Sequence, residues 1–329
     1  MAKGIETSEQ SQSPERINLL TNVAEMYYLE GKDQLEISRV VGVTRSMVSR
    51  MLTEARQRGI VEIRVNRTLQ TDPELEAAMV ERFGIKSAKI IALRGADDAA
   101  ALLNLGRAGA QVLQEYITPY STIALAWGTS ISATVDAVAE REVIPIKVVQ
   151  LVGAMGARNE EYDGHALVQR LATKLGGETY FINAPYLCPS AEVASAMLAT
   201  KSIEETVDMG RQAQVALFGI GSTTPKYSSY FLAGYVSQEE MDYILAADAV
   251  GDIAGIHFNL WGKLVCEDFY RRLVTIRHEH LLRIPTRIGV AGGPGKMVPI
   301  LGALRGGWIN VLVTDSLTAR KVLELDHIK

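Results

Sequence analysis

Residues 33–59 read DQLEISRVVGVTRSMVSRMLTEARQRG, and this stretch decides the fold of the N-terminal part of the chain. The apolar spacing in residues 34–41 predicts a short helix, and Asp33 is a residue type that caps helices at their start. Gly42 interrupts the pattern, because glycine adopts a left-handed turn that other residues resist. A short helix that ends in a glycine turn is the first half of a helix-turn-helix motif.

The second half of the motif is a helix predicted over residues 45–58 and ended by Gly59. One apolar face holds Met47, Val48, Met51, Leu52 and Ala55. Six polar residues outside this apolar face are candidate DNA-binding groups: Thr44, Arg45, Ser46, Ser49, Arg50 and Arg56. Thr44 also caps the helix at its start. Arginine forks suit guanine edges and serine hydroxyls suit bases or phosphates, so this helix is interpreted as a recognition helix. Arg56 lies further along the helix and is expected to contact a phosphate of the DNA backbone.

Helical spacing of apolar residues also predicts a helix over 14–29, and the alternating segment IVEIRV at 60–65 predicts a wing strand. The polar segment 1–13, MAKGIETSEQSQS, is expected to be a disordered tail. We therefore expect residues 14–66 to form a winged helix-turn-helix DNA-binding domain. The alternative is an ordinary three-helix bundle with exposed arginines.

Charge is distributed unevenly along the chain. The formal net charge is −4, which by itself argues against nucleic-acid binding. Between residues 39 and 67, however, seven arginines (39, 45, 50, 56, 58, 64 and 67) face only two glutamates (54 and 62). Such a local positive excess is typical of a DNA-binding module on an acidic body, although a solvated charged face is the simpler alternative.

A second domain is expected over residues 67–329, because a polar stretch leads to Pro73, which suits the first turn of a helix. Seven apolar, β-branched runs predict strands at 88–93, 122–127, 147–152, 179–183, 215–221, 286–292 and 309–315. Helices are predicted between and after them at 97–116, 130–139, 165–175, 192–209, 296–304 and 316–325. Buried strands that alternate with helices predict a Rossmann-like, mostly parallel α/β sheet covered on both faces.

Ligands of such sheets bind beyond the carboxyl ends of the strands, where this chain has several glycine-containing loops. Four loops contain Gly128-Thr129-Ser130, Gly153, Gly221 and the stretch from Gly293 to Lys296. A single glycine there is usually a tight turn. Hydroxyls, helix N-termini and a lysine in the same set favour a phosphate or polyol site. No Walker lysine pattern and no G-x-G-x-x-G follows a strand, so no nucleotide cofactor is expected.

With these residues identified, the chain resembles the SorC family of sugar-binding transcription regulators along nearly its whole length beyond the tail. The matching motifs lie at 34–38, 43–45, 58–61, 127–129, 251–255, 292–296 and 313–315. The resemblance implies an effector domain similar in fold to ribose-5-phosphate isomerase and glucosamine-6-phosphate deaminase, but without catalysis. It also implies a homo-oligomer, usually a tetramer, that binds operator DNA and is most often released from it by a phosphorylated sugar.

The resemblance further implies roles for individual residues. Thr129 and Ser130 correspond to positions at the effector phosphate, and Asp252 and Lys296 to positions at its polar groups. His165 stands where relatives carry a polar contact. The residues themselves leave alternatives open: Asp252 also suits turn capping, and Lys296 also suits a solvated first helical turn, although a lysine there opposes the helix dipole.

Two other functions use the same residues. An isomerase or deaminase with an appended DNA-binding domain would need a general base, for which Asp252 and His165 are the candidates. A free signalling molecule, instead of a metabolite, would occupy the same pocket. His278 and His280 are too close in sequence for one helical face, so a surface pair is favoured over a metal site. His257 is either a core residue or a site residue.

The remaining features concern location. Cys188 and Cys266 share no motif spacing and predict no disulfide framework, which fits a reducing cytoplasmic setting. No run of about 18 uncharged apolar residues is present, so a transmembrane helix is not expected.

Overall fold

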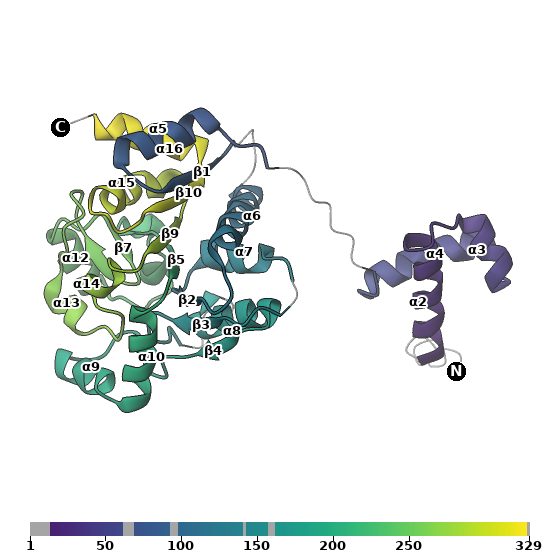
Figure 1. Cartoon of the computed structure of the whole chain (residues 1–329), viewed down its shortest axis with the longest axis horizontal. Helices are drawn as coiled ribbons and strands as arrows, with labels where there is room; N and C mark the ends of the chain where they lie inside the picture. The colour runs from purple at the N-terminus through teal and green to yellow at the C-terminus, as the bar shows by residue number, and fades with distance from the viewer. Residues whose placement is uncertain (1–13, 62–68, 93–97, 141–142, 157–161, 328–329) are drawn as a thin grey trace, which may run out of the picture. The chain divides into compact units, whose positions relative to one another are not determined.

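The computed structural model describes residues 14–61, 69–92, 98–140, 143–156 and 162–327. The chain divides into two compact units, Met1–Thr68 and Leu69–Lys329, each of which is described by itself (Figure 1). The tail expected at residues 1–13 and most of the wing strand expected at 60–65 lie outside the described residues.

The N-terminal unit contains helices α2 (Pro14–Tyr28), α3 (Gln34–Val41) and α4 (Arg45–Gln57). Its core consists of Leu20, Val23, Ala24, Ile37, Val48, Met51, Leu52 and Ala55. Asp33 accepts hydrogen bonds from the first amides of α3, and Glu36 accepts from the Asp33 amide in return, which forms a capping box. Gly42 ends α3 with φ of 74°, as the predicted turn requires. The helix-turn-helix pattern is therefore present.

Three apolar side chains of this unit are more exposed than their helical spacing indicated. Met47 was expected on the buried face of α4, but 46% of it is exposed. Leu35 and Val40 on α3 are 48% and 65% exposed. A short helix that packs on one side only buries a narrow face, and on α3 the apolar side chain on that buried face is Ile37.

The second unit contains a seven-stranded parallel sheet in the order β1-β10-β9-β5-β2-β3-β4. The strands are β1 (Ser87–Ile91), β2 (Thr122–Leu125), β3 (Lys147–Gln150), β4 (Glu178–Tyr180), β5 (Val215–Gly219), β9 (Thr286–Val290) and β10 (Val311–Asp315). Each overlaps one of the seven apolar runs that predicted a strand, although β4 shares only two residues with its run at 179–183. The predicted α/β architecture with a mostly parallel sheet is therefore present.

Side chains alternate between two apolar layers across this sheet. On β5, Val215 and Leu217 join the layer under α6, α7 and α8, whereas Ala216 and Phe218 join the opposite layer. The inner strands β2, β5, β9 and β10 are largely buried on both faces, which is why their sequences are continuous apolar runs, whereas the edge strand β4 is partly exposed. Helices α6 (Asp98–Tyr116), α7 (Thr129–Ala137) and α8 (Gly164–Leu175) cover one face (Figure 1).

The opposite face is covered chiefly by α5 (Pro73–Phe83), α12 (Gln238–Ala246), α15 (Met297–Arg305) and α16 (Ser316–Asp326). The helix predicted over 192–209 is in fact two helices, α9 (Ala191–Leu198) and α10 (Lys201–Arg211). Thr200 separates them, because its extended backbone (ψ 126°) ends one helix and its carbonyl accepts the first amides of the next.

A small antiparallel sheet was not predicted from the sequence. It consists of β6 (Gly221–Ser222), β7 (Gly251–Ile253) and β8 (Ile256–Phe258), in the order β6-β7-β8. Short elements surround it, namely η3 (Pro225–Tyr227), α11 (Ser229–Leu232), α13 (Glu267–Arg271), α14 (His278–Leu281) and η4 (Pro294–Lys296). This sheet brings Asp252 on β7 opposite Gly221 on β6, at the carboxyl end of β5.

The carboxyl ends of β9, β5 and β2 are adjacent in the main sheet. From β2 the chain continues outward through β3 and β4, and then returns to the other side of β2 to form β5. Such a switch point is where doubly wound sheets open a crevice for ligands.

Candidate functional site

The N-terminal unit presents a polar surface along α4. All six candidate DNA-binding residues are exposed, namely Thr44, Arg45, Ser46, Ser49, Arg50 and Arg56. Thr44 caps α4 by accepting a hydrogen bond from the Met47 amide, and its hydroxyl lies 3.0 Å from that of Ser46. Three arginine side chains, Arg45, Arg50 and Arg56, make no ion pair among the described residues. They are therefore available to an anionic partner.

Neighbouring arginines of the same unit have a different use. Arg16 on α2 and Arg58, just after α4, both pair with Glu54. The two guanidinium groups lower the pKa of the Glu54 carboxyl, the Arg16 hydrogen bond most of all. This cluster fastens α2 to the end of α4, so the positive charge in 39–67 is divided between structural pairs and the exposed face of α4.

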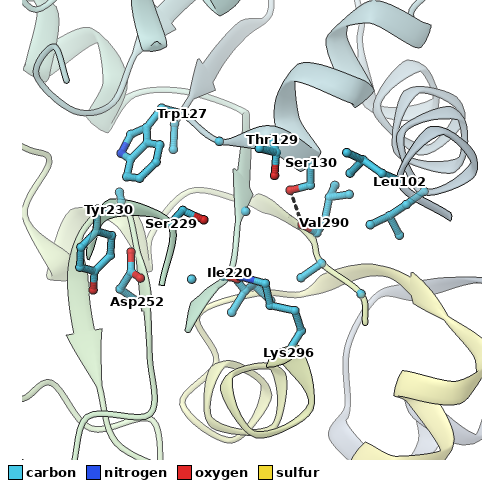
Figure 2. Close-up of a pocket in the computed structure, with 18 residues that line it drawn as sticks. Leu102, Trp127, Thr129, Ser130, Ile220, Ser229, Tyr230, Asp252, Val290 and Lys296 are labelled. Atoms are coloured by element: carbon cyan, nitrogen blue, oxygen red, sulfur yellow. Dashed lines mark hydrogen bonds between the residues drawn. The ribbon is translucent and has the colours of Figure 1, made fainter. Parts of the chain in front are cut away.

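In the second unit, a cavity opens at the carboxyl ends of β2, β5 and β9. It has three lobes, and Thr129 and Ser229 line all of them. The polar lobe, of about 120 Å³, contains Asp252, Lys296 and Ser130 (Figure 2). An aromatic lobe of about 270 Å³ contains Trp127, Tyr162 and Tyr235. An aliphatic lobe of about 590 Å³ contains Leu102, Met297, Leu317 and others.

One end of the cavity is the N-terminus of α7. Gly128 precedes the helix with φ of 133° and supplies no side-chain cap, so the first amides of α7 keep their donor capacity. Thr129 is exposed beside them, and the Ser130 hydroxyl donates to the Val290 carbonyl at 2.8 Å. Figure 2 shows both hydroxyls on the wall of the cavity. Uncapped amides at a helix N-terminus are suited to binding an anion such as a phosphate.

The opposite end of the polar lobe is formed by Asp252, which is 5% exposed. Its Oδ2 accepts the Gly255 amide at 3.2 Å, whereas its Oδ1 has no partner among the described residues. Burial raises the pKa of this carboxyl to about 6, although the Lys296 ammonium, the Gly255 amide and the Tyr230 hydroxyl act in the other direction. A buried acceptor without a partner is costly, so it marks a place for a ligand hydroxyl or a water molecule.

Lys296 enters the same lobe from the end of η4 (Figure 2). Its ammonium donates to the Ile220 carbonyl at 2.7 Å, so the side chain has an internal partner and does not simply stand in solvent at a first helical turn. Burial lowers its pKa, and Asp252 opposes that shift. Lys296 and Asp252 thus place one cation and one carboxylate in a polar lobe suited to hydroxyl groups.

Seven of the nine expected effector-binding residues line the cavity. They are Gly128, Thr129, Ser130, Gly221, Asp252, Gly293 and Lys296. Gly221 leaves the space that the Asp252 carboxylate occupies, since a Cβ there would lie 1.7 Å from Oδ1. The Gly293 amide donates to Asp315 and Thr318, both at 2.9 Å, which fixes the loop before α15.

Two expected residues, Gly153 and His165, are not among the residues that line the cavity. Gly153 follows β3 and packs against the chain at Ala184 and Pro185, where a Cβ would lie 2.7 Å from two carbonyl oxygens. The His165 ring stacks on Phe181 at 4.9 Å, and its Nε2 lies 3.2 Å from the Asn183 Oδ1. The contacts described for His165 are with Asp163, Phe181 and Asn183, and none is with Asp252.

Several cavity residues were not among the expected effector contacts, and three of these, Trp127, Ser229 and Tyr230, line its polar lobe. Tyr230 lies next to Asp252 (Figure 2). Its hydroxyl makes a short hydrogen bond with the Nε2 of His257, which is buried behind it. Trp127 belongs to the motif at 127–129, so the sequence could have indicated it. Ser229 and Tyr230 lie on α11, which contains no recognised motif.

His257 gives the fold a dependence on pH. Burial lowers the pKa of His257 to about 3, from an ordinary value of 6.5, so the unfolded chain binds a proton in this range more readily than the folded chain. Its stabilising contribution is complete above pH 6.5 and is lost as pH falls toward 3. We expect acidification from pH 6.5 to 4.5 to destabilise the native chain by roughly 2 kcal/mol more than the His257→Gln variant. Urea unfolding followed by tryptophan fluorescence at fixed protein concentration measures the difference. Parallel pH profiles for the two chains would contradict it.

Comparison with known proteins places this architecture in a family. Residues 67–324 match the family model Sugar-bind, described as "Putative sugar-binding domain". The sorbitol operon regulator of Klebsiella pneumoniae is 28% identical over 312 residues, which cover 94% of this chain and 98% of that protein. The deoxyribonucleoside regulator of Bacillus subtilis is 28% identical over 309 residues (94% and 98%), and the transcriptional regulator LsrR of an Enterobacter species is 30% identical over 309 residues (93% and 93%).

Solved structures agree with these similarities. The full-length sorbitol operon regulator SorC from Klebsiella pneumoniae superposes with a TM-score of 0.71 at 26% identity, covering 94% of this chain and 99% of that one. A transcriptional regulator from Streptococcus pneumoniae gives a TM-score of 0.73 at 27% identity, covering 77% and 97%.

Fold and similarities together define a transcriptional regulator, not an enzyme. The chain belongs to the SorC family of sugar-binding transcriptional regulators. Among the described helices, none has both the length and the apolar composition needed to cross a membrane.

Proposed function

We propose that this chain is a cytoplasmic repressor of a carbohydrate-utilisation operon, released from its operator by a phosphorylated sugar. The observation that carries the proposal is the cavity at the switch point, where the uncapped N-terminus of α7 faces a lobe that contains Asp252 and Lys296. The helix terminus suits a phosphate group, and the carboxylate and ammonium suit hydroxyls. One molecule that carries both kinds of group fits this arrangement.

The DNA-binding half of the proposal rests on α4. Its exposed N-terminal residues Arg45, Ser46, Ser49 and Arg50 suit base edges in a major groove, and Arg56 suits the phosphate backbone. A symmetric operator needs two such helices one helical turn apart, so we propose that the chain acts as a homo-oligomer. A sugar that relocates these helices needs a preference of roughly 5 kcal/mol for one state to switch occupancy completely.

A thermal-shift screen tests the effector class directly. The purified full chain is heated with ribose 5-phosphate, fructose 6-phosphate or glucose 6-phosphate, and with the same sugars without phosphate. A ligand that binds only the folded chain, at about 100 times its Kd, stabilises it by roughly 2.7 kcal/mol, which raises the melting temperature. We expect at least one phosphorylated sugar to do this and its free sugar to have little effect. Equal shifts for free and phosphorylated sugars would contradict a phosphate site.

A further inference from the structure

Two residues of the cavity, Thr129 and Ser229, border all three of its lobes. The other charged and polar side chains are confined to one or two lobes: Asp252 lines only the polar lobe, and Lys296 lines the polar and aliphatic lobes. The lobes therefore meet beside Thr129 and Ser229, and Figure 2 shows the hydroxyls of both residues directed into the open space of the cavity. A ligand that extends from one lobe into another must pass these two hydroxyls.

The two residues belong to different elements. Thr129 is the first residue of α7, and Ser229 is the first residue of α11. The stretch around α11 supplies part of the wall of every lobe, since Tyr227 lines the aliphatic lobe, Tyr230 the polar lobe and Tyr235 the aromatic lobe. Ser229 is the one residue of this stretch that reaches all three lobes, so it is the part of this wall that any occupant of the cavity meets.

The Ser229 hydroxyl has hydrogen-bonding capacity that the fold does not use. Both Ser229 and Thr129 are exposed, and neither side chain makes a hydrogen bond within the part of the chain that the structure describes. The Ser130 hydroxyl, by contrast, already donates to the Val290 carbonyl at 2.8 Å. A serine hydroxyl offers one donor and two acceptor lone pairs, so Ser229 can bind a ligand group without losing an internal partner.

We propose that Ser229 is a further effector-binding residue, whose hydroxyl donates a hydrogen bond to the phosphate group of the ligand from the wall formed by α11. This inference rests on the proposed function, because it takes the phosphate to lie at the N-terminus of α7. A phosphate group has three strong acceptor oxygens. The α7 amides and the Thr129 hydroxyl hold it from one element, and Ser229 holds it from a second one. The sugar then extends into the polar lobe toward Lys296.

The test compares four full-length chains by isothermal titration calorimetry: wild type, Ser229→Ala, Ser229→Thr and Ser228→Ala. The probes are ribose 5-phosphate, fructose 6-phosphate and glucose 6-phosphate, and inorganic phosphate is added as a competitor. For the sugar phosphate that wild type binds most tightly, we expect Ser229→Ala to weaken affinity by about 10- to 100-fold, the usual value of one hydrogen bond to a charged group. Inorganic phosphate should compete less well by a similar factor, because it uses the same hydroxyl.

The other two variants distinguish this role from a merely structural one. Ser229→Thr keeps the hydroxyl and should keep most of the affinity. Ser228→Ala is the matched control, because Ser228 is the adjacent serine, its buried hydroxyl has no partner among the described residues, and it lines none of the three lobes. It should bind the sugar phosphate as wild type does. Since Ser229 is exposed, Ser229→Ala should also keep the melting temperature of the free chain.

Several results would overturn the inference. One is equal affinity in wild type and Ser229→Ala, and another is a loss of the same size in Ser229→Thr or in Ser228→Ala. A third is a weaker affinity for the sugar phosphate in Ser229→Ala while inorganic phosphate competes unchanged, or does not compete even in wild type, because the hydroxyl would then not bind the phosphate group. If wild type bound none of the sugar phosphates, the proposed function itself would fail.

Discussion

Replacing Arg50 with alanine is expected to weaken binding to a cognate promoter fragment by about 10- to 100-fold per recognition helix and to relax the preference for one base pair. The reason is that a forked guanidinium at a base edge contributes both affinity and discrimination. Arg50 is exposed on α4 and forms no ion pair among the described residues, so its loss should leave the melting temperature unchanged. Fluorescence anisotropy with the promoter fragment and with single-base variants measures both effects.

Arg56→Ala is the matched control for that experiment. Arg56 is also an exposed arginine on α4, but near the end of the helix, where phosphate contact is expected. Its removal should weaken binding to all fragments about equally and lower the slope of log affinity against log salt by about 1. If Arg50→Ala left affinity and base preference unaltered, α4 would not be the recognition helix in the orientation assigned to it.

The second large effect concerns the anion end of the cavity. We expect Thr129→Asp to weaken binding of the phosphorylated effector by about 100-fold or more, because two like charges close to each other repel by several kcal/mol near a protein surface. Thr129 is exposed at the first position of α7, where an aspartate favours the helix dipole, so the fold should be as stable as before or slightly more so. Calorimetric titration with the sugar phosphate and thermal unfolding measure the two quantities.

Thr129→Asn is the control for Thr129→Asp, since it has nearly the same size and shape without the charge. It should lose far less affinity. A chain with Thr129→Asp should also remain on its operator when the effector is added, because DNA binding resides in the other unit. Comparable losses in the Asn and Asp variants would show that shape, and not charge, decides binding at α7, and would remove the argument for a phosphate there.

The sheet of the second unit was largely predictable from the sequence. Parallel strands buried on both faces are continuous apolar runs, and such runs overlapped all seven strands, although only by two residues at the partly exposed edge strand β4. The hairpin β7–β8 escaped prediction because each strand has only three residues, too few to show a period. The split between α9 and α10 escaped because Ala199 and Thr200 continue the helical pattern, and only the backbone conformation of Thr200 reveals the break.

The site was predictable only in part, for a geometric reason. Loops after parallel strands share one edge, so glycine and hydroxyl residues there indicated a site, but not which loops meet. Gly128, Gly221 and Gly293 follow β2, β5 and β9, which are neighbours. Gly153 follows β3, one strand further out, and its loop packs against Ala184 and Pro185. Tyr230 enters the site on the short helix α11, and His257 packs behind it on β8; no local sequence pattern predicted either position.

The most direct test of the account is a titration of the full chain onto its own promoter DNA at several salt concentrations, with and without the sugar phosphate found by the thermal-shift screen. The account predicts tight binding that falls steeply between about 50 and 200 mM salt, as phosphate contacts require, and a further fall when the sugar phosphate is present. Binding that ignored both salt and sugar phosphate, or no binding to any promoter fragment, would contradict it.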